Sequence, residues 1–274
     1  TKKTCFFIRH GESKWNQAQA AKNLKNMLKE YDHGLSGEGR SQAEALSQDI
    51  LTHSEDPDVQ KFLSATAVFS SPLTRAIQTT LIGLQDHPTR QRDGVTLLQD
   101  AREIKKIGGF DTVGTAKGEQ IGVRVRKLIS ELYQGDEEAA AKLTTPAIDV
   151  SDAACEWWTH AEKADSKACI KARITEVLTK IRLAAGETMI ITGHSLLWRT
   201  MYKMHGKSKQ LGPAAAEFGQ CKMPNCGVCM CEFDFSEGVS PAACMTSIKL
   251  IFGKELHHRG YVDNEGRGSM VAVG

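Results

Sequence analysis

The chain lacks features that would each point to a different class of protein: a long apolar run, a strong net charge and paired cysteine motifs. None of the apolar stretches in its 274 residues approaches the length of a membrane-spanning helix, so we expect no membrane partner. The formal net charge is only +2 and the basic residues are spread along the chain, which argues against a nucleic-acid partner. A small anionic ligand is compatible with this balance.

The eight cysteines do not form the two C-x-x-C pairs that are typical of a structural zinc site. The alternation from Val228 to Phe235 places Cys229 and Cys231 on one strand face, where cysteine acts as a small core residue. Structural zinc is therefore the less favoured alternative. Reduced thiols favour an intracellular, cytoplasmic location. Organelle import through a removed N-terminal segment stays open, because the chain begins without methionine.

Composition and spacing favour one domain of ordinary size. With 41% hydrophobic and 25% charged residues, the chain can bury a single large core. We expect this domain over residues 1–252, with insertions near 17–34 and 104–165 that act as lids or binding loops. Residues 253–274 hold several glycines and few large apolar side chains, which predicts a mobile tail.

Short apolar, β-branched runs alternate with segments of helical periodicity. The runs predict strands at 4–8, 66–69, 188–192, 228–235 and 248–252. Apolar residues recur at helical spacing over 43–50, 77–84, 170–181 and 197–204. This order predicts an α/β fold with a mostly parallel sheet sandwiched by helices.

Basic and hydroxyl residues gather where several of these strands end. Arg9-His10-Gly11-Glu12 follows the first strand, and Thr192-Gly193-His194-Ser195 closes a later one. In the strand-to-helix turn Ser70-Ser71-Pro72, Ser71 is the expected N-cap, which puts Arg75 in the first helical turn. Ligands of open α/β sheets bind at the carboxyl ends of strands. We therefore expect Arg9, His10, Arg75 and His194 to converge on one anion-sized pocket.

Together with the capped helix start Leu35-Ser36-Gly37-Glu38-Gly39-Arg40, these segments resemble the histidine phosphatase superfamily, also called phosphoglycerate-mutase-like. The resemblance covers residues 4–252. It implies a metal-independent phosphatase, without a cofactor, that hydrolyses a small phosphomonoester through a phosphohistidine on His10. It also implies that Glu103 is the general acid, in preference to Asp100 or Asp111.

The residue types fit phosphoryl transfer, because arginine donates forked hydrogen bonds that match phosphate geometry. The predicted catalytic residues are His10, Glu103, His194, Arg9 and Arg75. The predicted phosphate-binding residues are Arg9, Ser13, Asn16, Ser36, Arg75 and His194, and no metal ligands are expected. Ser13 and Ser36 are equally explained as helix caps. The expected partner is a small phosphorylated substrate, and the oligomeric state stays open.

Two other functions remain as alternatives. A cofactor-dependent phosphoglycerate mutase uses the same phosphohistidine but returns the phosphoryl group to its substrate. The segment after Asn16 is long and lacks the aromatic and glycine pattern that resembles the substrate loop of these mutases, which favours the phosphatase. A catalytically inactive phosphate-binding or scaffold protein is the third possibility, and the intact set of basic residues weighs against it.

Overall fold

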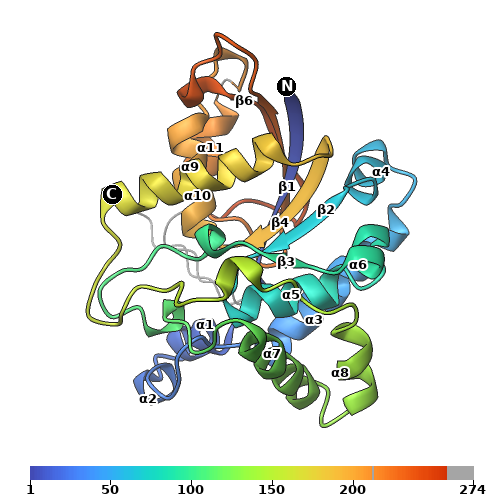
Figure 1. Cartoon of the computed structure of the whole chain (residues 1–274), viewed down its shortest axis with the longest axis vertical. Coiled ribbons are helices and arrows are strands. Elements are labelled where there is room, and N and C mark those ends of the chain that lie inside the picture. Colours follow the sequence, from blue (N-terminus) through green and yellow to red (C-terminus); the bar gives the residue numbers. More distant parts are fainter. Residues whose placement is uncertain (212, 258–274) are drawn as a thin grey trace.

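A computed structural model describes residues 1–211 and 213–257 of the chain (Figure 1). Its strands are β1 (Lys2–Arg9), β2 (Ala67–Ser70), β3 (Thr96–Leu97), β4 (Thr188–Gly193), β5 (Val228–Asp234) and β6 (Met245–Phe252). Its α-helices are α1 (Lys14–Ala20), α2 (Leu24–Met27), α3 (Gly37–Thr52), α4 (Pro57–Leu63), α5 (Thr74–Gly83), α6 (Pro88–Asp93), α7 (Glu119–Leu132), α8 (Glu137–Leu143), α9 (Lys167–Leu183), α10 (Ser195–His205) and α11 (Ala214–Gln220). Short 3-10 helices are η1 (Gln99–Ala101), η2 (Phe110–Thr112), η3 (Ser151–Ala153), η4 (Lys209–Leu211) and η5 (Pro241–Ala243).

The strands form one mixed sheet in the order β3-β2-β4-β1-β5-β6. The pairs β1 with β4, β4 with β2 and β2 with β3 are parallel, whereas β5 is antiparallel to both β1 and β6. The prediction of an α/β fold with a mostly parallel sheet is confirmed. β3 was not predicted from the sequence, because two residues are too few to show a period.

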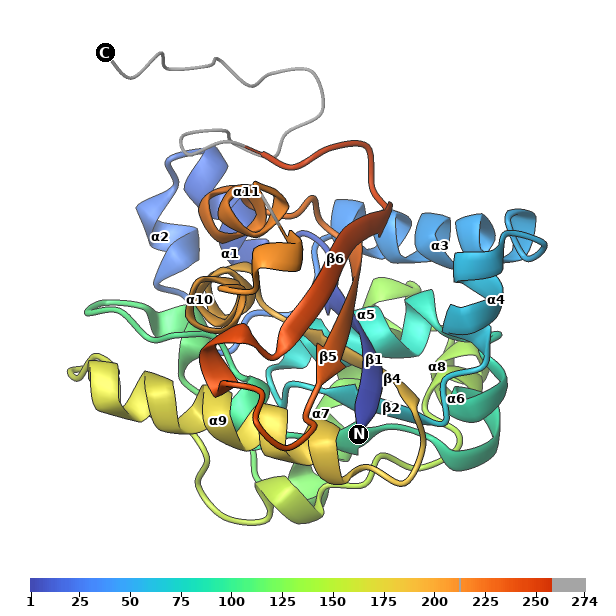
Figure 2. The same ribbon diagram turned by 90° about the horizontal axis from the view of Figure 1, so that it is seen from above.

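Helices cover both faces of the sheet. Side chains alternate along a strand, so Phe6 and Ile8 pack with apolar residues of α3, α5 and α7. Cys5 and Phe7 point the other way and pack with residues of α9 and α10. The two helical layers are visible on either side of the sheet in Figures 1 and 2.

The cysteines of β5 belong to the core, as their alternation predicts. Cys229 and Cys231 are fully buried in the cluster that includes Phe7, and the cysteines are free thiols. Within residues 1–211 and 213–257, no group of three or more His, Cys, Asp or Glu side chains is arranged to hold a metal ion. None of the helices in this part of the chain is long and apolar enough to cross a membrane.

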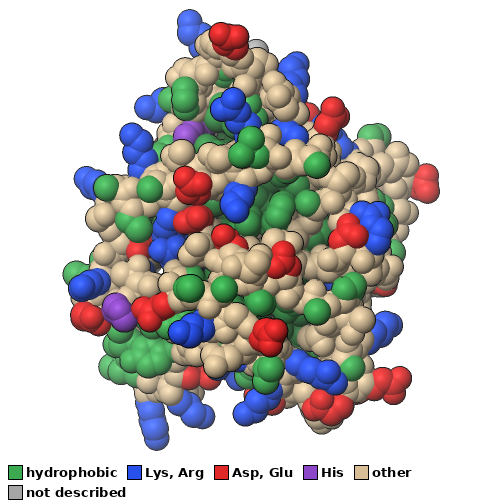
Figure 3. Space-filling model, viewed as in Figure 1, with side chains coloured by type: hydrophobic (Ala, Val, Ile, Leu, Met, Phe, Trp, Pro, Cys, Tyr) green, Lys and Arg blue, Asp and Glu red, His purple; other side chains and the backbone are tan. Residues whose placement is uncertain are grey.

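The predicted insertions differ in how they pack. In segment 104–165, Ile121, Val125 and Ile129 of α7 are buried in the core, so this segment supplies part of a helical layer. Segment 17–34 forms α1 and α2 and leaves Leu24 and Leu28 exposed. Figure 3 shows hydrophobic side chains gathered in this region, at the lower left. The single-domain division stays a prediction.

The start of the predicted tail packs back onto the domain. The backbone groups of His257 and Lys222 exchange two hydrogen bonds of 2.7 Å, and they form an isolated bridge. The rest of the predicted tail, residues 258–274, lies outside the described part of the chain.

The loop after β1 is packed tightly against the first turn of α3. The amide of Ser36 donates to the carbonyl oxygen of Glu12 at 2.9 Å. A Cβ atom placed on Gly39 would lie 2.0 Å from that same oxygen, whereas a Cβ atom on Gly37 would meet nothing within 4 Å. Gly39 therefore permits the close approach that fixes the course of the loop carrying His10.

Two glycine substitutions in α3 test this packing. We expect Gly39→Ala to lower the free energy of unfolding by about 1–3 kcal/mol, because loop or helix must shift to relieve the clash. Gly37→Ala, in the same helical turn, should be neutral or stabilising by up to about 1 kcal/mol, because alanine favours the helix. Urea unfolding of both variants provides the measurement, and equal effects of the two would contradict the account.

Candidate active site

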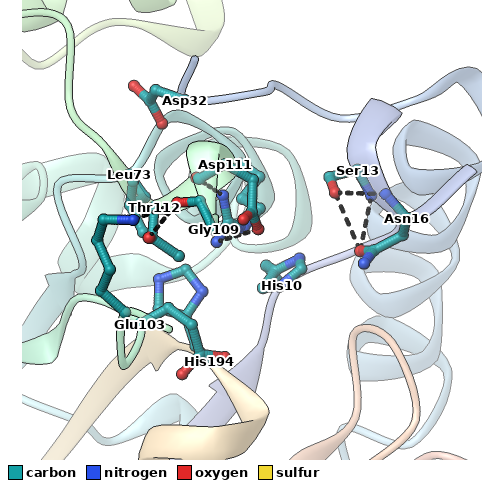
Figure 4. A network of polar contacts seen from close by, with 12 residues as sticks. His10, Ser13, Asn16, Asp32, Leu73, Glu103, Gly109, Asp111, Thr112 and His194 are labelled. Atoms are coloured by element: carbon teal, nitrogen blue, oxygen red, sulfur yellow. Dashed lines mark hydrogen bonds and ion pairs between the residues drawn. The ribbon is translucent and has the colours of Figure 1, made fainter. Parts of the chain in front are cut away.

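The sheet register brings the predicted site residues to one edge. β1 and β4 pair up to Arg9 opposite Gly193, so His10 and His194 both follow at the end of that ladder. The amide of His10 donates to the carbonyl of Gly193 at 3.1 Å. The two imidazole rings lie side by side, with centroids 5.1 Å apart (Figure 4).

The first turn of α5 carries Arg75 to the same edge, as predicted. The predicted N-cap is wrong, because the helix begins at Thr74 and Leu73 takes the N-cap position. Ser71 instead holds the turn, where its hydroxyl accepts from the amide of Leu73 at 3.3 Å. A distant residue satisfies the helix end, since the Asp32 carboxylate accepts from the amide and hydroxyl of Thr74 at 2.8 and 2.6 Å.

His10 has the geometry of a neutral nucleophile. Its Nδ1 lies 2.6 Å from the carbonyl oxygen of Gly11. A carbonyl only accepts, so Nδ1 carries the proton and the neutral ring leaves a lone pair on Nε2. Burial, followed by the charges of Arg75 and Arg9, holds the pKa of His10 well below its ordinary value. The ring therefore stays uncharged at neutral pH.

His194 is buried beside His10 and is also neutral. Its Nε2 lies 2.8 Å from the Ser71 hydroxyl. Its Nδ1 is buried without a hydrogen-bond partner among residues 1–211 and 213–257. Burial is the main cause that lowers the pKa of His194, and the positive charge of Arg75 adds to it.

The two arginines supply buried positive charge. A terminal nitrogen of Arg9 donates to the carbonyl of Met223 at 2.5 Å. One terminal nitrogen of Arg75 donates to the carbonyl of Asp111 at 2.6 Å, and the other lies 3.4 Å from the Asp111 carboxylate. Both arginines lie within electrostatic reach of His10 and His194. The structure thus brings Arg9, His10, Arg75 and His194 together.

Glu103 reaches the site from the loop after η1. Its carboxylate accepts from the amides of Leu196 and Leu197, at 3.3 and 3.1 Å, and so caps the first turn of α10 directly behind His194. Burial raises the pKa of Glu103, although the amide of Ile104, the charge of Arg75 and the amide of Leu196 oppose the change. A raised pKa suits a group that must hold a proton near neutral pH.

Ser13, Asn16 and Ser36 are engaged with their own helix starts. Ser13 and Asn16 form a reciprocal capping box at α1. The Ser36 hydroxyl donates to the Glu12 carboxylate at 2.7 Å and accepts from the amide of Gly39 at 3.0 Å. These contacts match the capping interpretation, and a role of these side chains in phosphate binding stays a prediction.

Several residues that support the site were not predicted from the sequence. Thr79 accepts from the amide of Gly11 at 3.0 Å, one helical turn after Arg75. Asp32, Asp111 and Met223 reach the site through loops whose paths carry no periodic signal. Ser71 lay in the predicted turn, where the expected role was a helix cap, and Asp111 had been weighed only as an alternative general acid.

The pKa directions give a prediction for stability. His10 and His194 have lowered pKa values in the folded protein and ordinary values in the unfolded chain, so below about pH 6.5 the unfolded chain binds more protons. The free energy of unfolding should therefore fall as the pH drops from 7 towards 5. Replacing both residues by Gln should make this loss shallower. NMR titration of the His10 imidazole checks the cause, and a midpoint near 6.5 would contradict it.

Part of this chain matches the sequence model of a known protein family. The family model described as histidine phosphatase superfamily (branch 1) matches residues 5–105. A search of curated proteins found no match to the chain.

Solved structures show a similar fold. "Mycobacterial hydrolase 1" is 13% identical with a TM-score of 0.50, and the match covers 91% of this chain and 97% of that one. A phosphoserine phosphatase from Entamoeba histolytica is 16% identical with a TM-score of 0.44, covering 91% and 95%. A phosphoglycerate mutase from Bacillus anthracis is 18% identical with a TM-score of 0.47, covering 85% and 89%.

The matched segment 5–105 carries Arg9, His10, Arg75 and Glu103, and the structure adds His194 to them at the same sheet edge. Over residues 5–105 this chain is therefore similar to the histidine phosphatase superfamily (branch 1).

Proposed function

We propose that this protein is a phosphatase that hydrolyses a small phosphomonoester through a phosphohistidine on His10. One observation carries the proposal: Nδ1 of His10 lies 2.6 Å from the Gly11 carbonyl, so the lone pair of the neutral ring is on Nε2, and two buried arginines lie nearby. A neutral imidazole is the nucleophile that phosphoryl transfer needs, and the guanidinium groups offset the charge of the phosphoryl oxygens.

The residues suffice for both steps of the reaction. Nε2 of His10 attacks phosphorus, and the bond from phosphorus to the leaving oxygen breaks while Glu103 gives that oxygen a proton. In the second step water attacks the phosphohistidine, the bond from phosphorus to Nε2 breaks, and the Glu103 carboxylate takes a proton from the water. Arg9, Arg75 and His194 hold the non-bridging oxygens throughout. Phosphate leaves, and the enzyme returns to its first state.

Hydrolysis is favoured over mutase activity by the segment after Asn16. This segment is long and forms α1 and α2, with the exposed side chains of Leu24 and Leu28. It lacks the aromatic and glycine pattern that resembles the substrate loop of the mutases.

Trapping the covalent intermediate tests this proposal. Wild-type protein quenched in alkali after mixing with a labelled phosphomonoester should carry an acid-labile phosphoryl group on His10. His10→Ala should lose both label and turnover and still bind inorganic phosphate, because Arg9 and Arg75 remain.

The fate of the label separates the alternatives. Faster release to water than to a phosphoglycerate acceptor supports a phosphatase, and the reverse preference supports a mutase. Phosphate binding without label or turnover across a broad substrate panel would leave an inactive binding protein. A label on another residue would overturn the mechanism.

The general acid has its own test. Glu103→Gln keeps an oxygen for the amides of Leu196 and Leu197 but holds no transferable proton. We expect kcat/KM for an alkyl phosphate to fall by about 10² to 10⁴, the usual contribution of acid catalysis. The loss should be much smaller for p-nitrophenyl phosphate, whose leaving group needs no proton. Equal losses for both substrates would show that Glu103 acts only through the structure of α10.

A further inference from the structure

The four residues that should hold the phosphoryl group are almost entirely buried. Arg9, His10, Arg75 and His194 are 2%, 5%, 1% and 0% exposed, respectively. A phosphoryl group must touch all of them to be held and attacked, so part of the protein has to move before a phosphomonoester can bind.

Asp111 already contacts the guanidinium group of Arg75, which should bind phosphate. Both terminal nitrogens of Arg75 face it, one at 2.6 Å from its carbonyl oxygen and the other at 3.4 Å from its carboxylate. The Asp111 charge also lies near enough to Glu103 to help raise the pKa of that carboxyl, after the larger effect of burial. A phosphate dianion and this carboxylate cannot share one guanidinium at such distances without strong repulsion. Figure 4 shows Asp111 with Gly109 and Thr112 above His10 and His194.

The segment that carries Asp111 is anchored at both ends. At one end, the amide of Lys105 donates to the buried Asp165 carboxylate at 3.0 Å. At the other, Gly114 lies so close to Trp157 and Trp158 that a Cβ atom would come within 2.6 and 2.5 Å of their rings. Movement is therefore restricted to the residues in between.

Ile107 and Gly108 in this segment are packed loosely. Ile107 is 83% exposed, and a Cβ atom on Gly108, which has a φ of +76°, would meet nothing within 4 Å. The Gly109 carbonyl accepts from Lys105 Nζ at 3.0 Å and from the Thr112 hydroxyl at 2.7 Å, so these hydrogen bonds are internal to this part of the chain. Phe110 meets Tyr31 with ring centroids 5.5 Å apart. Segments with few buried contacts open at low free-energy cost.

We propose that residues 106–113 form a lid that Asp111 holds closed on Arg75, and that the phosphoryl group of the substrate opens it by displacing Asp111. The lid is a feature of the phosphatase site proposed above and rests on that function. Asp111 is the internal competitor for the phosphate position. Because only the open state binds phosphate, the observed affinity is the intrinsic affinity multiplied by the fraction of molecules that are open.

Asp111→Asn tests the lid, because it removes the charge of the competitor and keeps its size and its backbone carbonyl. We expect the inhibition constant of inorganic phosphate and the KM for p-nitrophenyl phosphate both to fall, by about three- to tenfold. Asp93→Asn is the matched control, because Asp93 pairs with Arg92 on an exposed helix end and should change neither constant.

Hydrogen exchange of the amides of residues 106–113 gives a second readout that does not depend on turnover. In the wild-type protein, inorganic phosphate should speed exchange in this segment. In Asp111→Asn, exchange there should already be fast without phosphate.

The outcomes separate the lid from the proposed function. If the wild-type protein binds phosphate and Asp111→Asn binds it equally or more weakly, the lid proposal alone is overturned. A fall of more than about tenfold in kcat for alkyl phosphates, with no fall in KM, would also overturn it and assign Asp111 the role of general acid. Folded wild-type and variant proteins that both fail to bind phosphate would overturn the lid and the proposed function together.

Discussion

The site depends on the burial of two arginines next to two histidines, because the charges of these arginines have to be paired inside the protein. Buried charge is costly unless it is paired, and a histidine among such charges gives up its proton first. Arg9 therefore uses the Met223 carbonyl, Arg75 uses Asp111, and His10 stays neutral. The same field that keeps the nucleophile uncharged attracts an anion. Nucleophile activation and phosphate binding thus have one electrostatic origin.

The parallel core of the sheet sets this constellation in place. The register of β1 with β4 ends both strands level, so the residues that follow are neighbours although they lie far apart in the sequence. β2 pairs with β4 in the same direction and delivers the Ser71 turn and α5. Close contacts such as Gly39 against the Glu12 carbonyl then fix the loop after β1. The positions of the site residues therefore follow from the register of the strands and from the absence of a side chain at Gly39.

The residues that were predicted from sequence are those that follow periodic elements. The apolar runs located the ends of β1 and β4, and with them His10 and His194; the turn after β2 located Arg75. Asp111 and Asp32 could not be found this way, because each reaches Arg75 or its helix through an irregular loop.

The helix start at Thr74 was missed because capping by a distant carboxylate leaves no local pattern. Segment 104–165 was expected to be an insertion, yet Ile121, Val125 and Ile129 lie four residues apart on one face of α7 and pack into the core.

The central claim is that Nε2 of a neutral His10 attacks phosphorus while Nδ1 donates to the Gly11 carbonyl. The most direct test of this claim is phosphorus NMR of the trapped phosphoenzyme, together with the coupling of phosphorus to the labelled imidazole. The two phosphohistidine isomers give different spectra. The account predicts a phosphoryl group on Nε2 of His10. A phosphoryl group on Nδ1, or on any other residue, would contradict it.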